Sequence, residues 1–194
     1  MSLESLSVAA SVGTLLVIGA TAIFAAIQLR HARAGNQIAA IMNLSEILQT
    51  PEVQESRRFI RDELGERMRD PGFRAQFQES PLGEAARPLL LVGNFYEEVG
   101  TFVKRGVIDG DIACDLWSAQ ILGAWEHMSP AIAIVRRRQG PATWENFEYL
   151  VTLAEQWIER FPNGTLPKNR RRKTPEDVWL AEDTRIEQQG ADTR

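Results

Sequence analysis

The 194-residue chain has an ordinary globular composition, with 44% hydrophobic and 25% charged residues, and its length suits one domain with appendages. Its net charge of −4 argues against wholesale nucleic-acid binding, which usually requires a strongly basic domain. The single cysteine, Cys114, excludes an intramolecular disulfide, and two histidines, His31 and His127, are too few for a histidine-built metal site.

A long apolar segment opens the chain. Residues 5–29 carry no charge, and residues 6–29 include eleven Leu, Ile, Val or Phe and six Ala. As a helix rising about 1.5 Å per residue, 24 residues would extend roughly 36 Å, enough to cross a hydrocarbon core about 30 Å thick. A cleaved signal peptide is disfavoured because no Lys or Arg precedes the segment. We therefore expect a transmembrane anchor with its flank over residues 1–35.

The charges that flank this segment predict its orientation. Glu4 precedes it, whereas Arg30 and Arg33 follow it directly, and positive flanks favour the cytoplasmic side. We expect the N-terminus outside the cell membrane and the C-terminal domain in the cytoplasm. Small residues four apart, such as Ala22 and Ala26, would let two such helices approach closely, so a homo-oligomer is a further expectation.

The rest of the chain predicts an all-α fold: a single N-terminal transmembrane helix followed by an antiparallel bundle of about four to five helices over residues 36–161. The first continues the apolar segment to residue 48. Thr50 and Pro51 then indicate the start of a second helix over residues 51–69. Residues 70–83 are expected to be mostly irregular. The three remaining helices are expected over 84–105, from Asp109 or Asp111 to Arg138, and over 142–161.

In these last three helices the apolar residues recur three and four positions apart, which is typical of a helix with one buried face. The recurring residues are Val92, Phe95, Val99 and Phe102, then Trp117, Ile121, Ala124, Met128, Ile132 and Val135, and finally Trp144, Phe147, Val151, Ala154, Ile158 and Phe161. Pro130 is expected to kink the fourth helix.

The composition changes at residue 162, where we expect a basic and largely disordered tail with one short helix that begins near Thr174. Five of six consecutive residues are positively charged: Lys168, Arg170, Arg171, Arg172 and Lys173. Such a run is attracted to anionic lipid head groups by about 1 kcal/mol per charge near the surface, so membrane lipid is the expected partner. A solvated linker is the alternative. Nucleic acid is disfavoured because no aromatic residue interleaves with the charges.

Two blocks of sequence resemble a known family. The first is Leu-Arg-His-Ala-Arg-Ala-Gly-Asn-Gln at residues 29–37, and the second is Asn-Phe-Tyr-Glu-Glu-Val-Gly at residues 94–100, with Val-Lys-Arg-Gly-Val-Ile-Asp at 103–109. Together they resemble an uncharacterised bacterial family of membrane-anchored helical proteins, known only as a domain of unknown function (type 4760). The resemblance ends before the tail. It implies a span in a bacterial inner membrane and a helical domain, and it implies no activity, cofactor or catalytic residue.

The most suggestive polar cluster comprises Asn94, Glu97, Glu98, Asp109, Asp111 and Asp115. Facing carboxylates in a bundle can hold a divalent metal, but di-iron bundles use Glu-x-x-His pairs, which this sequence lacks. The alternative, which we favour, is that Asp109 and Asp111 cap a helix while Glu97 or Glu98 pairs with an arginine. Accordingly, no metal, cofactor or catalytic residue is assigned. His127 is expected to be half-buried, and Cys114 to be a packing residue.

The sequence has no phosphate-binding glycine loop, nucleophile elbow or zinc spacing. The leading interpretation is therefore a membrane-tethered helical interaction or regulatory module of unknown specific role, rather than an enzyme. The alternative is an enzyme or metal-binding bundle that uses the acidic cluster around Glu97 and Asp111. A third hypothesis, a ligand sensor, requires a cavity lined by Trp117, Trp125 and Phe95.

Overall fold

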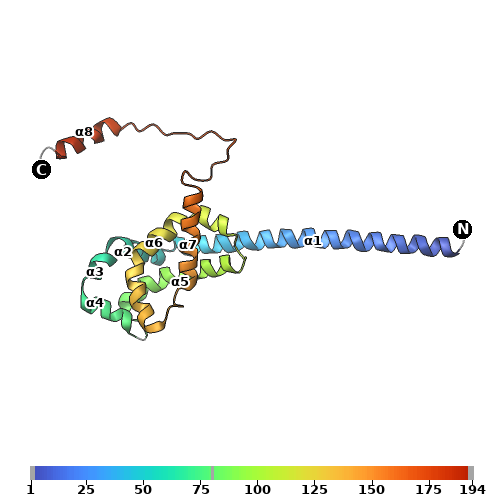
Figure 1. The fold of residues 1–194 in the computed structure, drawn as a ribbon, viewed down its shortest axis with the longest axis horizontal. Helices are drawn as coiled ribbons and strands as arrows, with labels where there is room; N and C mark the ends of the chain where they lie inside the picture. Colours follow the sequence, from blue (N-terminus) through green and yellow to red (C-terminus); the bar gives the residue numbers. More distant parts are fainter. Residues whose placement is uncertain (1–2, 80, 192–194) are drawn as a thin grey trace. The chain divides into compact units, whose positions relative to one another are not determined.

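The computed structural model describes residues 3–79 and 81–191, and in this part of the chain the secondary structure is helical, without strands (Figure 1). The predicted all-α class is confirmed. The chain divides into two compact units, Met1–Pro162 and Asn163–Arg194. The helical bundle belongs to the first unit, and the basic run belongs to the second.

Helix α1 (Leu3–Gln49) joins the apolar segment to the bundle without a break (Figure 1). Large apolar side chains between Val12 and Leu29 are exposed, whereas Leu44 and Leu48 are buried in the core. Within the described residues, α1 is the one helix long and apolar enough to cross a membrane. One continuous helix therefore has an apolar, uncovered first part and a last part that belongs to the bundle.

Helix α2 (Pro51–Asp62) begins at the predicted residue. The Thr50 hydroxyl does not cap it, because that group donates to the Ile47 carbonyl at 2.8 Å. The predicted helix over residues 51–69 is wrong beyond Asp62: the backbone breaks at Glu63 and resumes as α3 (Leu64–Arg67). Directly after this break, Leu64 is fully buried, so its side chain packs into the hydrophobic core.

Short helices occupy much of the stretch that was expected to be irregular. Helix α4 (Pro71–Ala75) is capped by the Asp70 carboxylate, which accepts a hydrogen bond from the Gly72 amide at 2.8 Å. The 3-10 turns η1 (Gln76–Gln78) and η2 (Glu84–Ala86) follow. Phe77 is fully buried and packs edge-on against Phe73, with ring centroids 5.3 Å apart. This aromatic pair anchors a segment that has no helical periodicity to predict it.

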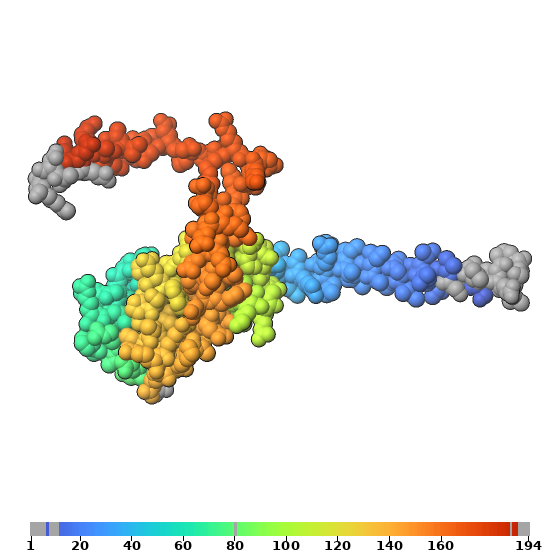
Figure 2. Space-filling view, viewed as in Figure 1, coloured from blue at the N-terminus to red at the C-terminus, as the bar shows by residue number. Residues whose placement is uncertain are grey.

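Three longer helices form the centre of the bundle: α5 (Arg87–Lys104), α6 (Gly110–Gln139), which contains Pro130, and α7 (Glu145–Arg160). They pack on one another, and α2 and the end of α1 pack against them. Figure 2 shows the side chains of α6 and α7 in direct contact. The predicted apolar stripes are mostly buried; the exceptions, all partly or largely exposed, are Phe102, Ala124, Ile158 and Phe161.

Helix α7 begins at Glu145, later than the predicted start at Ala142. Trp144 is buried as expected, but it lies outside the helix, with the left-handed backbone conformation (φ 56°). The α-helical stripe was therefore the wrong reason for its burial.

In the second unit, residues 163–179 contain no α-helix, and α8 (Leu180–Ala191) follows. The short helix thus begins six residues after Thr174, the predicted start. Lys168, Arg170, Arg171, Arg172 and Lys173 are all exposed.

The core predicts a large effect for one ring of α7. Phe147 is fully buried, stacks on Tyr96 with centroids 4.8 Å apart, and meets the Trp125 ring edge-on. Phe147→Ala should therefore lower the free energy of unfolding by about 3–5 kcal/mol, measured by chemical denaturation of the full chain in detergent. The control is Glu155→Ala on the same helix, where the side chain is exposed and the expected change is within about 0.5 kcal/mol. Equal effects of the two substitutions would contradict this packing.

Candidate functional site

Two of the predicted polar residues meet at the start of α7. Asn94 and Glu97 lie on α5, on the side that faces Trp144, Asn146 and Phe147. We call this contact, completed by Gly93 and Gly100 of α5, the α5–α7 junction. Three of its residues, Asn94, Glu97 and Gly100, belong to the second block of sequence that carries the family resemblance.

Glu97 supplies the N-terminal cap of α7 from another helix. Its Oε2 accepts hydrogen bonds from the backbone amides of Asn146 (3.0 Å) and Phe147 (2.9 Å), and its Oε1 accepts one from the side-chain amide of Asn146 (2.8 Å). The first amides of a helix have no partner within that helix, and negative charge is favourable beside them. The residue in the N-cap position, Trp144, makes no side-chain cap hydrogen bond. The carboxylate of Glu97 therefore does what a local Ser, Thr or Asp usually does.

Two glycines let α7 approach α5 closely. A Cβ atom on Gly100 would lie 2.1 Å from the carbonyl oxygen of Asn146, and one on Gly93 would lie 2.7 Å from the Trp144 ring. Neither position can hold a larger residue unless the helices move apart. The distance between Glu97 and the amides of α7 thus depends on the absence of side chains at Gly93 and Gly100, each about one helical turn from Glu97.

Side chains of two other helices, α5 and α6, hold Trp144 in place. Its indole N–H donates to Asn94 Oδ1 at 3.0 Å. From α6, the Arg136 guanidinium donates to the carbonyl oxygens of Thr143 (2.9 Å) and Trp144 (3.3 Å). Arg136 also pairs with Glu148 at 2.7 Å. A left-handed conformation is unfavourable for a residue with a bulky side chain, and these contacts hold it in place.

The other predicted residues lie elsewhere. Asp109 caps α6, with Oδ1 accepting hydrogen bonds from the amides of Asp111 (2.9 Å) and Ile112 (3.2 Å). Asp111 pairs with Arg160 at 2.8 Å on the surface. Asp115 is exposed on α6, and Glu98 is exposed on α5 beside an open groove. Asn94 and Glu97 thus lie at the start of α7, Asp109, Asp111 and Asp115 lie at or within the first two turns of α6, and Glu98 lies apart from both groups.

This arrangement bears on the chemistry available to the cluster. Both oxygens of Glu97 already accept N–H donors, and among the described residues neither Glu97 nor Glu98 forms an ion pair with an arginine, contrary to the favoured alternative. Across residues 3–79 and 81–191, no three His, Cys, Asp or Glu side chains are grouped so that they could hold a metal ion. The residues of the junction position a helix.

The remaining reactive side chains are a thiol and an imidazole. Cys114 is buried, as expected, and burial raises the pKa of its thiol to about 11, with a smaller contribution from the Asp111 charge. The thiolate, which is the nucleophilic form, is therefore scarce near neutral pH. The expectation of a half-buried His127 is wrong: the residue is exposed on α6. Trp117 and Phe95, proposed to line a sensor cavity, are buried in the core.

Sequence reasoning missed Gly93, Gly100 and Arg136. The two glycines are seven residues apart on α5, which places them on one face with Glu97 between them. That spacing could have indicated close helix packing. Nothing local marks Arg136, because its acceptors are carbonyls in the loop that follows its own helix.

The junction predicts different effects for two adjacent glutamates. Glu97→Gln should lower the free energy of unfolding by about 1–3 kcal/mol, because a carboxamide nitrogen would replace one of two acceptors that face buried N–H donors. Glu98→Gln makes the same chemical change on an exposed side chain and should alter stability by less than about 0.5 kcal/mol. Both are measured by denaturation of the full chain in detergent. If Glu97→Gln is as stable as the parent chain, the cap described here is incorrect.

Comparison with known proteins identifies a family without an assigned role. No curated protein matches the chain, and no solved structure matches it. The family described as Domain of unknown function (DUF4760) matches residues 15–157, from within the apolar part of α1 to the last turns of α7. The chain therefore belongs to this family, and the match includes every residue of the α5–α7 junction.

Proposed function

We propose that this chain is a single-pass membrane protein whose helical domain lies in the cytoplasm and acts as an interaction or regulatory module. The observation that carries the proposal is the uncovered apolar part of α1. Leu15, Leu16, Val17 and Ile18 form four consecutive residues that are each at least 60% exposed, and residues 5–29 carry no charge. Apolar surface of this extent is unfavourable in water and favourable in a bilayer.

The polar residues within this segment are compatible with a bilayer. The Thr21 hydroxyl donates to the Val17 carbonyl at 2.8 Å, so it has a partner within its own helix. A hydroxyl paired in this way avoids most of the free energy that an unsatisfied polar group would add in hydrocarbon. The span in this proposal is the segment that ends before Arg30, and Arg30 and Arg33 then lie at the cytoplasmic surface.

The regulatory part of the proposal rests on the continuity of α1. The helix has no break between its apolar part and Leu44 and Leu48, which are buried among residues of the core. A tilt or rotation of the span would therefore act directly on the bundle, without a flexible linker to absorb it. Self-association through the small residues of the span, such as Ala22 and Ala26, is one way in which such a movement could arise.

Topology tests the proposal directly. A reporter that is active only in the cytoplasm should work when fused after Arg194, and a reporter that is active only outside should not, because positive flanks remain inside. Arg30→Glu with Arg33→Glu should weaken this bias, whereas Arg137→Glu with Arg138→Glu, far from the span, should not. The opposite reporter pattern in the parent chain, or recovery of the whole chain in the soluble fraction, would refute the proposal.

We also propose that the basic run in the second unit contacts anionic lipid. The five positive side chains are exposed and lie within six residues, so several can approach a surface together. The acidic residues of α8, such as Glu182 and Asp183, follow closely and oppose this attraction. An energy of about 1 kcal/mol per basic residue is therefore an upper value for the segment.

Vesicle binding separates lipid contact from a solvated linker. A peptide of residues 163–194 should bind vesicles that contain anionic lipid at low salt and detach as salt increases, because the screening length falls to about 8 Å near physiological ionic strength. Replacing the five basic residues by Gln should abolish binding, whereas replacing Glu182 and Asp183 by Gln should strengthen it. Absence of binding at low salt, or equal binding to zwitterionic vesicles, would favour the linker.

A further inference from the structure

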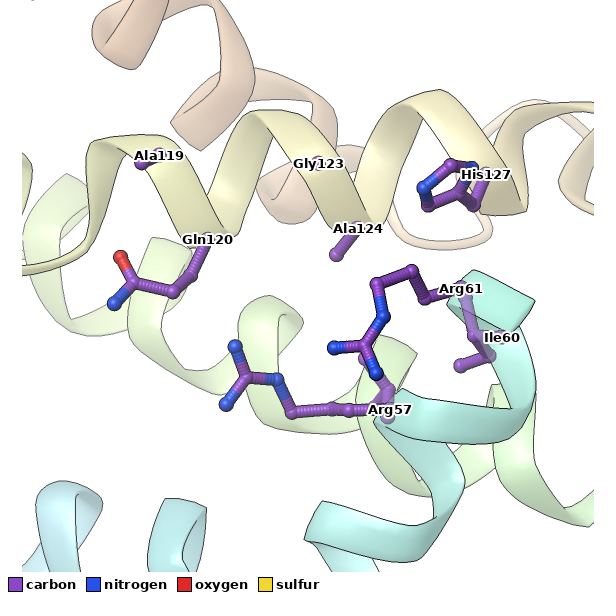
Figure 3. A pocket seen from close by; sticks show the side chains of 9 residues that line it. Arg57, Ile60, Arg61, Ala119, Gln120, Gly123, Ala124 and His127 are labelled. Atoms are coloured by element: carbon purple, nitrogen blue, oxygen red, sulfur yellow. The ribbon is translucent and has the colours of Figure 1, made fainter. Parts of the chain in front are cut away.

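A pocket of about 350 Å³ lies between α2 and α6, with α5 beneath it. Figure 3 shows Arg57 and Arg61 extending from α2 toward the gap, opposite Gln120, Ala124 and His127 on α6. The full lining consists of Arg57, Ile60, Arg61, Val92, Ala119, Gln120, Gly123, Ala124 and His127. None of these residues belongs to the acidic cluster or to the α5–α7 junction.

The pocket has an apolar bottom, and several residues on its α6 side have small side chains. Ile60 and Val92 are 3% and 1% exposed, so they present only a small apolar surface at the bottom of the pocket. The α6 wall carries no large side chain at Ala119, Gly123 and Ala124. Behind it, the Tyr96 hydroxyl donates to the Gln120 carbonyl at 3.2 Å and ties α6 to α5. The space is thus bounded by packed helices and lies at the small end of ligand pockets.

The polar groups of the lining are mostly hydrogen-bond donors. The lining contains the guanidinium groups of Arg57 and Arg61, which can only donate, and also the imidazole of His127 and the carboxamide of Gln120. None of the lining residues is acidic. Asp62, outside the lining, accepts hydrogen bonds from Nε and one terminal nitrogen of Arg61 at 2.7 and 3.0 Å. The second terminal nitrogen of Arg61 takes no part in that pair. Arg57, half-buried one helical turn earlier, adds a second cation on the same side.

We propose that this pocket binds a phosphate group carried by a small molecule or a lipid head group. Guanidinium groups match the oxygens of phosphate with paired, charge-assisted hydrogen bonds, and Arg57 and Arg61 place two of these groups on one side of the pocket. Gln120 and His127 would add donors from the opposite wall, and Ile60 and Val92 would contact the apolar part of the ligand. Arg57 is the main anchor, because Arg61 shares its charge with Asp62.

The test uses the full chain and two probes at constant ionic strength. Phenyl phosphate, titrated into the protein in zwitterionic detergent and followed by calorimetry, represents a soluble monoester. Nanodiscs that contain phosphatidic acid, compared with nanodiscs of phosphatidylcholine alone, represent a lipid head group. We expect saturable binding of at least one probe with one site per chain. Binding of phenyl phosphate alone identifies a soluble ligand, and binding to phosphatidic acid that phenyl phosphate displaces identifies a head group.

Matched variants assign the binding to the pocket. Arg57→Gln should weaken binding about tenfold or more, since a charged hydrogen bond is lost. Ala124→Leu, which extends a side chain that points from α6 toward the gap in Figure 3, should also weaken it. Arg137→Gln removes the same charge from an exposed position of α6 outside the lining and should leave binding unchanged. The melting temperature of each variant shows whether it is folded.

Two results would overturn the proposal. One is the absence of saturable binding of both probes to the parent chain. The other is an equal loss of affinity in Arg57→Gln and Arg137→Gln, which would mean that the probes respond to overall charge and not to this pocket. Loss of affinity in folded Arg57→Gln with full affinity in Arg137→Gln supports it, even if Ala124→Leu fails to fold.

Discussion

The bundle depends on the contact through which α5 caps α7. Glu97 accepts the amides of Asn146 and Phe147, and this is possible only because Gly93 and Gly100 leave space for the chain to come close. Phe147, the next residue in contact, then stacks on Tyr96 in the core. The Glu97 cap and the stacking of Phe147 on Tyr96 therefore hold the start of α7 in the same position. Each contact keeps the residues of the other at the distance that it requires.

The rest of the domain is arranged around this contact. Arg136 fixes the loop between α6 and α7, so that three helices are joined at one point. The hydroxyl of Tyr96, the residue before Glu97, donates to the Gln120 carbonyl and so connects α5 to α6 beside the pocket that Arg57 and Arg61 line. The end of α1 adds Leu44 and Leu48 to the same core. The junction and the pocket thus belong to one packed bundle, and in the proposed function the membrane span is joined to it through the unbroken helix α1, so a change at one can alter the others.

The sequence predicted the helices whose apolar residues recur with helical spacing, and it did not predict the contacts between segments that are far apart in the chain. The apolar periodicity located α5, α6 and most of α7, and Asp109 was recognisable as a cap because it precedes the helix it caps. The break at Glu63 and the buried ring of Phe77 have no periodic pattern to predict them. The cap supplied by Glu97 lies 49 residues away from Asn146, and only tertiary structure connects the two. For the same reason the sequence alone does not bring Arg57 and Arg61 of α2 together with Gln120 and His127 of α6, which line one pocket in the folded chain.

Amide hydrogen exchange tests the central contact most directly. The amides of Asn146 and Phe147 occupy the first turn of α7, where helical amides have no partner of their own and usually exchange fast. If Glu97 caps the helix, both should be protected in the parent chain, and Glu97→Gln should remove that protection while leaving the amides in the middle of α6 protected. Fast exchange of these two amides in the parent chain, or unchanged protection in Glu97→Gln, would contradict the account.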